Sequence, residues 1–273
     1  MDKLIKNNNG CFISKKVPYK KIKEFPLRIL NKCFDFAYDM TYGNKGEHRS
    51  YRSGGKIIRK NGEVFINTFQ GKLAEYGIWN EFENRSFDIN SPDLSEYNLG
   101  KWDDFDIKYK DYNIAVKSTK FYGNLLLLEK YDWNEYGIYI PNEDKGTGYY
   151  DFFVLIRISP DGEYIMKEKR KLYSSEKIDR EDLRKIIINN SNKWSYDVPG
   201  FITHEDLCSI IKNKDIIEAG KMLNGKTPMD TNNYYVQAGC MRNINAMFSQ
   251  FESIKVKEID ESGNKKADEL KLE

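Results

Sequence analysis

The stretch WDDFDIKYKDYNIAVKSTK, residues 102–120, decides the fold that this sequence predicts. Apolar residues alternate with polar ones before and after Lys110–Asn113, which is the period of two expected of strands with one buried face. Asp and Asn between the two halves favour a turn. The simplest structure for this stretch is therefore a tight antiparallel hairpin.

The register of this hairpin would bring a carboxylate and an ammonium group together. If residues 111–112 form the loop, Asp106 lies directly across from Lys117. In the same register Lys108 lies across from Ala115. Directly opposed side chains share a face and are only about 5 Å apart. Such a pair can hold a divalent cation and assist attack on a phosphodiester.

The order of these residues resembles the PD-(D/E)XK nuclease superfamily, in which an Asp is followed by a turn and then by hydrophobic-acid-hydrophobic-Lys-Ser/Thr. In that superfamily the Asp and the second acid bind magnesium, and the Lys orients the nucleophilic water. The resemblance implies that Asp106 and the backbone carbonyl of Val116 bind Mg²⁺ and that Lys117 is catalytic. Pro92-Asp93 also matches letters of the motif name, but loop composition follows it, so Asp106 is the better candidate.

The chain departs from the superfamily at the second acid, which falls at Ala115, the remaining metal-site position. A site without this carboxylate lacks one ligand for Mg²⁺. Two explanations are open: Glu75 or Glu129 supplies the missing acid, or the chain is a catalytically impaired variant that binds DNA and cuts it poorly. Every other residue of Ile114–Thr119 fits the pattern, which favours impairment. In that event Ala115→Glu should produce Mg²⁺-dependent cleavage.

A helix is predicted before the hairpin, over Phe65–Phe82, with Asn67 or Thr68 capping its amino end. Apolar residues recur along it at spacings of three and four. In the resembled superfamily, a helix at this place commonly supplies an auxiliary Glu to the metal site. The resemblance therefore implies a metal-binding and catalytic role for Glu75.

The amino-terminal region is basic. Residues 1–60 hold 15 Lys and Arg against 5 Asp and Glu, whereas residues 61–133 hold 8 against 13. Residues 42–60 form a Gly-rich segment with interleaved Arg, Lys and Tyr. Backbone amides and guanidinium groups in such a loop can clamp a polyanion. We therefore expect the DNA-binding residues to be Arg49, Arg52, Lys56 and Arg59.

Other segments carry signals for regular structure. Periodicity and capping signals predict helices over Leu27–Met40, Ser174–Asn189 and Leu207–Lys212, a central strand buried on both faces over Asp151–Ile158, and a strand within Asn232–Asn243. Gln237 and Arg242 are candidate contacts to DNA bases or phosphates. His204 lies in the predicted cap of the last helix, which favours a structural role over metal binding.

Composition favours a soluble protein. The chain has 40% hydrophobic and 32% charged residues, and no apolar run approaches the roughly 18 residues that a membrane-spanning helix needs. Residues 1–10 are polar and do not resemble a secretory signal. The 4 cysteines are widely spaced without a C-x-x-C pair, which indicates reduced thiols rather than a zinc site. We therefore expect a cytoplasmic protein.

These signals predict a single α/β nuclease domain over residues 1–273, with a mixed central sheet flanked by helices. We expect DNA contacts in residues 1–64, the catalytic core in 65–170, recognition and dimerisation elements in 171–254, and a flexible tail in 255–273. The resemblance implies a Type II restriction endonuclease, a homodimer that cuts double-stranded DNA with Mg²⁺. The alternatives are a non-catalytic DNA-binding relative and a repair or phage-defence nuclease of the same fold.

Overall fold

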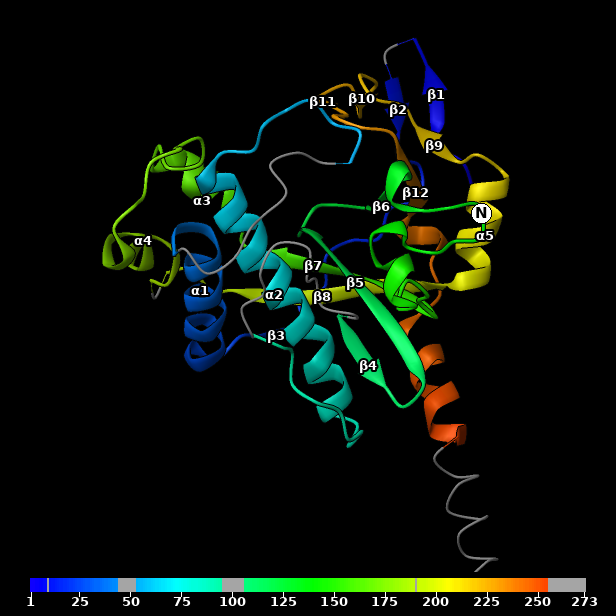
Figure 1. The fold of residues 1–273 in the computed structure, drawn as a ribbon, viewed down its shortest axis with the longest axis horizontal. Coiled ribbons are helices and arrows are strands. Elements are labelled where there is room, and N and C mark those ends of the chain that lie inside the picture. The colour runs from blue at the N-terminus through cyan, green and yellow to red at the C-terminus, as the bar shows by residue number, and fades with distance from the viewer. Residues whose placement is uncertain (9, 44–52, 95–105, 190, 255–273) are drawn as a thin grey trace, which may run out of the picture.

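A computed structural model describes the chain except for residues 9, 44–52, 95–105, 190 and 255–273 (Figure 1). The first residues of the hairpin stretch, 102–105, lie outside the described residues, and so do Arg49 and Arg52 of the basic loop and the predicted flexible tail. The described residues form a mixed α/β structure in which helices flank mixed sheets. This confirms the predicted α/β class with a mixed sheet flanked by helices.

A five-stranded sheet lies at the centre, in the order β3-β8-β7-β5-β4. Its strands are β3 (Lys23–Glu24), β8 (Ser195–Thr203), β7 (Phe152–Ser159), β5 (Tyr112–Lys120) and β4 (Ile107–Tyr109). Strands β5 and β7 are parallel and the other neighbours antiparallel. All residues of β7 except the last are buried, because β7 has a strand on each side and a layer on each face. This confirms the central strand predicted over Asp151–Ile158.

Two long helices, α1 (Leu27–Tyr42) and α2 (Asn61–Glu83), cover one face of this sheet (Figure 1). Helix α1 confirms the prediction, whereas α2 begins four residues before the predicted Phe65, and Asn67 and Thr68 lie inside it. Its first turn is stabilised by Glu63, whose Oε2 accepts a hydrogen bond of 2.8 Å from the Lys60 N–H. Residues 244–254 are also helical and pack on the same core.

The opposite face of the sheet is covered by a three-stranded sheet and by α5 (His204–Lys212). The strands, in the order β6-β12-β9, are β6 (Leu125–Glu129), β12 (Asn233–Gln237) and β9 (Ile216–Ile217). Thr203 and Asp206 form a capping box, since the Asp206 carboxylate accepts from the Thr203 N–H at 2.9 Å. The predicted cap of α5 and the strand predicted within Asn232–Asn243 are therefore confirmed.

The remaining elements lie around these two layers. They are the four-stranded sheet β1 (Ile5–Asn7), β2 (Gly10–Phe12), β10 (Met222–Leu223) and β11 (Thr227–Pro228), the helices α3 (Gly162–Glu168) and α4 (Arg180–Ile187), and the 3-10 turns Lys130–Asp132, Ile140–Lys145 and Ala238–Cys240. Helix α4 is shorter than the helix predicted over Ser174–Asn189, because Asp179 caps it by accepting from the Asp182 N–H at 3.0 Å.

All four cysteines are unpaired, and Cys11 and Cys33 are buried, as expected of small apolar residues. Within the described part of the chain, every helix is too short or too polar to cross a membrane.

Candidate active site

The β4–β5 hairpin has a register two residues away from the predicted one. Ile107 lies opposite Ile114 and Lys108 opposite Asn113, so the loop is Lys110-Asp111 and not residues 111–112. Lys110 adopts φ +53, the left-handed conformation that hairpin turns of the primed types require at their first central position. The predicted pairing of Lys108 with Ala115 is therefore wrong.

The shift of two residues leaves the faces of both strands unchanged, because side chains alternate with a period of two. Asp106 lies one residue before β4, and continuing the register places it opposite Ala115, so the predicted pairing of Asp106 with Lys117 is also wrong. Its Oδ2 accepts a hydrogen bond of 2.7 Å from the Val116 N–H. The carboxylate of Asp106 is thus fixed against the peptide that precedes Lys117.

Lys117 lines a pocket of about 540 Å³ near the carboxyl end of β5. The walls come from β5, from Asn67 and Gln70 of α2, and from the odd-numbered residues of β6. Lys117 is half-buried and forms no ion pair with any described residue. Its ammonium group is therefore available to a ligand or to a bound water.

Glu129, at the end of β6, lines the same pocket. Its Oε2 accepts a hydrogen bond of 2.7 Å from the Ser53 N–H, and the Ser53 carbonyl accepts from Thr231 at 2.6 Å. The segment from residue 53 to 60 then leads to the start of α2 and carries Arg59, which also lines the pocket. The fold thus brings Lys117 and Glu129 into one cavity, from strands of two different sheets.

Two further charged groups of this pocket are paired with each other. The Lys120 ammonium donates to Glu163 at 2.6 Å and lies 3.4 Å from Asp161. Burial disfavours its charge, but the hydrogen bond and the two carboxylates outweigh burial and raise the pKa of Lys120 above its usual range. Lys120 therefore stays protonated, and Glu163 and Asp161 offset its charge.

Glu75 lies on α2, as predicted, but it is not among the residues that line the pocket. It is 9% exposed, and its carboxylate accepts from the Lys72 ammonium at 2.8 Å. It also lies near Cys33 of α1: burial raises the pKa of that thiol, and the negative charge of Glu75 raises it further. Glu75 thus serves the α1–α2 interface in this structure, while Asn67 and Gln70 are the α2 residues at the pocket.

Ala115 is 1% exposed and belongs to the apolar core between the five-stranded and three-stranded sheets. Phe153 of β7 is its neighbour in the register, and Leu126 of β6 lies in the same cluster. The methyl group of Ala115 is therefore part of a packed core as well as the position of the superfamily's second acid.

Of the predicted DNA-binding residues that the structure describes, Lys56 is exposed and Arg59 lines the pocket. Gln237 is buried, and its amide bonds the Ser14 N–H at 2.8 Å and the Asp2 carbonyl at 3.0 Å, so it is not accessible to DNA. Arg242 pairs with Asp206.

His204 does not behave as a metal ligand in this structure. Its two ring nitrogens lie 3.1 and 3.0 Å from the carbonyl oxygens of Tyr150 and Tyr136. The structural role that its place in the cap favours is therefore confirmed.

Few side chains that could bind a hard cation lie close together among the described residues. Among the described residues no group of three or more His, Cys, Asp or Glu could together hold a metal ion. Mg²⁺ in nucleotide and nucleic-acid enzymes commonly takes only one or two protein carboxylates and completes its shell with water and substrate phosphates. Asp106, the Val116 peptide and Glu129 are oxygen donors of this hard type, so the chemistry of the residues present fits Mg²⁺.

The chain was compared with protein families, curated proteins and solved structures. No protein family, no curated protein and no solved structure matches the chain.

Proposed function

We propose that this protein is a Mg²⁺-dependent, sequence-specific endonuclease for double-stranded DNA, of the Type II restriction kind, with Asp106, Lys117 and Glu129 as its catalytic residues. One observation carries the proposal: Lys117 and Glu129 line one pocket, beside the Val116 peptide that holds the Asp106 carboxylate. Asp106 itself is not among the residues that line the pocket; two acids and a lysine are a residue set that metal-assisted phosphodiester hydrolysis can use.

Each residue has a distinct role in the proposal. The Lys117 ammonium orients the attacking water, and its half-buried position keeps its charge close to the developing charge on the phosphate. Asp106 and Glu129 hold the metal, with the Val116 carbonyl as a further donor. When bound, Mg²⁺ would stabilise charge on the phosphoryl oxygens and lower the pKa of a coordinated water.

The proposal includes a restriction-endonuclease-like fold. A helix, a hairpin with the Asp and Lys, and a buried central strand follow one another as α2, β4–β5 and β7, in the order that the resemblance implies. Arg59 and Lys117 add positive charge to the pocket, which supports a phosphate backbone as the ligand. We further propose a cytoplasmic homodimer, since two-fold symmetric DNA is matched by two-fold symmetric protein.

The proposal makes Glu129, and not Glu75, the source of the missing acid. The structure supports this choice because Glu129 lines the pocket with Lys117, whereas Glu75 pairs with Lys72 on the α1 side of α2. With Glu129 as the second acid, Ala115 is a natural core residue and not an inactivating substitution.

The test is cleavage of plasmid DNA with Mg²⁺ by the unchanged protein and by Asp106→Asn, Lys117→Ala, Glu129→Gln and Ala115→Glu. We expect the unchanged protein to cut and the first three variants to be slower by at least about a hundredfold. Cleavage by Ala115→Glu alone would mean that the chain is a catalytically impaired nuclease. Specific binding without cleavage by any form would identify a non-catalytic DNA-binding relative.

A further inference from the structure

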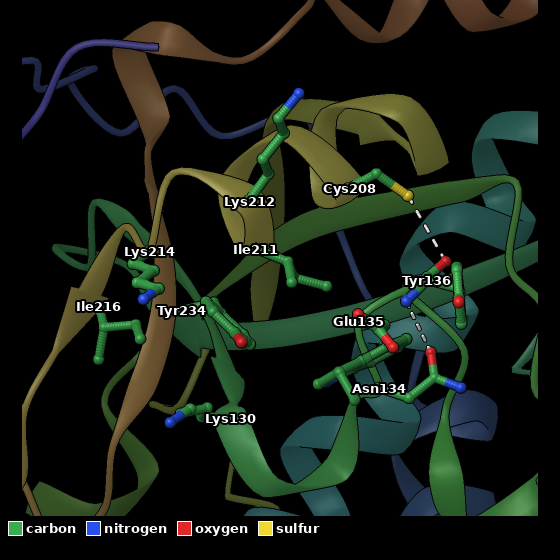
Figure 2. Close-up of a pocket in the computed structure, with 11 residues that line it drawn as sticks. Lys130, Asn134, Glu135, Tyr136, Cys208, Ile211, Lys212, Lys214, Ile216 and Tyr234 are labelled. Carbon is green, nitrogen blue, oxygen red and sulfur yellow. Dashed lines mark hydrogen bonds between the residues drawn. The ribbon is translucent and has the colours of Figure 1, made fainter.

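A second pocket, of about 710 Å³, lies on the other side of β6 from the candidate active site. It opens between α5, which carries Cys208, Ile211 and Lys212, and the chain that follows β6, with Tyr234 of β12 between them (Figure 2). Its volume falls in the range of sites that bury a small ligand. Nothing in the proposed nuclease reaction uses it.

The floor of this pocket is apolar, aromatic and rigid. Trp133 packs edge-to-face on Phe153 with ring centroids 5.3 Å apart, and it is 6% exposed. Tyr234 is also mostly buried, and burial raises the pKa of its hydroxyl. This hydroxyl forms no hydrogen bond with any residue in the described part of the chain. Ile211 adds a half-buried aliphatic surface, so the floor offers aromatic and aliphatic groups on which a planar apolar group can pack.

The rim of the same pocket is strongly basic. Lys130, Lys212 and Lys214 line it, and none of them forms an ion pair with a described residue. In Figure 2 Lys130 and Lys214 lie on the side of Tyr234 nearest β9, and Lys212 extends from the upper rim. Lys130, whose ammonium lies 5.7 Å over the Tyr131 ring, and Lys214 are on the same side of the opening, and two ammonium groups there match a ligand with several negative charges better than a single carboxylate.

The pocket also holds a carboxylate. Glu135 is exposed, lines the pocket, and makes no hydrogen bond or ion pair with a described residue. A carboxylate accepts hydrogen bonds from hydroxyl and amino groups. A fatty acid has no such group beyond its head, whereas a ribose and an amino-substituted base have several.

We propose that this pocket is a binding site for a nucleoside triphosphate or diphosphate. The base lies on the floor of Tyr234 and Ile211, the phosphates lie beside Lys130 and Lys214, and Glu135 accepts from the ribose or from the exocyclic amino group. The site is separate from the pocket of Lys117 and does not depend on the proposed nuclease activity.

Cys208 provides a reporter within the site. Its thiol lines the pocket and donates to the Tyr136 carbonyl at 3.5 Å, while Cys240 is also half-buried but lies outside the pocket. The experiment follows alkylation of the two cysteines by N-ethylmaleimide, by mass spectrometry of the full-length protein, with ATP as the probe. At about ten times its Kd, ATP should slow modification of Cys208 roughly tenfold and leave Cys240 unchanged.

Variants and competitors decide between the possible ligands. Lys130→Gln combined with Lys214→Gln should weaken ATP protection by about tenfold or more, whereas Lys226→Gln, at an exposed lysine in the turn between β10 and β11, should not. Equal protection by inorganic tripolyphosphate would overturn the proposal in favour of a general polyanion surface. Protection by dodecanoate but not by ATP would overturn it in favour of a lipid. Absence of protection by millimolar ATP would reject the site altogether.

Discussion

Replacing Ala115 by glutamate restores the second acid of the resembled motif at a buried position. The side chain at position 115 shares a face of β5 with Lys117, and the next peptide, at Val116, holds the Asp106 carboxylate by a hydrogen bond of 2.7 Å. The same position is 1% exposed and packs in the apolar core with Phe153. The substitution therefore places a charge in a core unless a cation compensates it.

The size of the effect follows from these two facts. Overpacking costs about 1–3 kcal/mol, and burying an uncompensated carboxylate costs several kcal/mol, so a loss of at least about 3 kcal/mol is expected without metal. For a chain of this size that loss lowers the Tm by roughly 6–12 °C. Mg²⁺ at about a hundred times its Kd would return about 2.7 kcal/mol, which is most of the loss.

The assay is thermal unfolding of Ala115→Glu with EDTA and across a Mg²⁺ titration. Ala115→Gln is the matched control, because it adds nearly the same volume without the charge. We expect both variants to be destabilised in EDTA and only the glutamate variant to recover with Mg²⁺.

If Mg²⁺ stabilises the glutamate variant no more than the glutamine variant, position 115 does not lie at a metal site. The expected destabilisation would be refuted if the glutamate variant were as stable as the unchanged protein in EDTA, since position 115 would then not be enclosed by the core.

Three further predictions concern other parts of the structure. Glu75→Gln should lower the free energy of unfolding, measured with denaturant, by about 3 kcal/mol and leave plasmid cleavage per folded molecule unchanged. A hundredfold loss of cleavage at unchanged stability would instead support the auxiliary catalytic role predicted from sequence. Arg157 is fully buried and donates to Asp197 at 2.8 Å, so Arg157→Met should destabilise the fold by about 3–5 kcal/mol in urea unfolding; a loss below about 1 kcal/mol would contradict this. Replacing Lys56 and Arg59 by Gln should flatten the slope of log K against log salt for duplex DNA by about two units, and an unchanged slope would remove them from the DNA interface.

The sequence by itself determined the elements whose signals are local. The apolar run from Phe152 specified a strand covered on both faces, and the Thr203–Asp206 spacing specified the start of α5. Alternation on both sides of Lys110 specified the hairpin and the faces of its strands. These features depend on propensity, periodicity and capping, which a window of a few residues contains.

Local signals gave the wrong bounds for two elements, the start of α2 and the loop of the β4–β5 hairpin. Gly62 weakens a helix by propensity, yet α2 begins before it; position 62 requires glycine because a Cβ there would lie 2.0 Å from the Lys171 carbonyl oxygen. The observed hairpin loop lies one residue before the predicted one. Lys110 adopts a positive φ at its first position, and lysine is not a residue type that favours this conformation.

Only the tertiary structure decided which charges share a site. Glu75 and Lys117 are placed together by the resemblance, but α2 turns Glu75 towards α1 and presents Asn67 and Gln70 to the pocket. Glu129 lines the same pocket as Lys117 because β6 belongs to the second sheet, where it pairs with β12, more than a hundred residues later in the chain. Such a pairing depends on closing long loops and burying a shared core, and no short stretch of sequence carries that information.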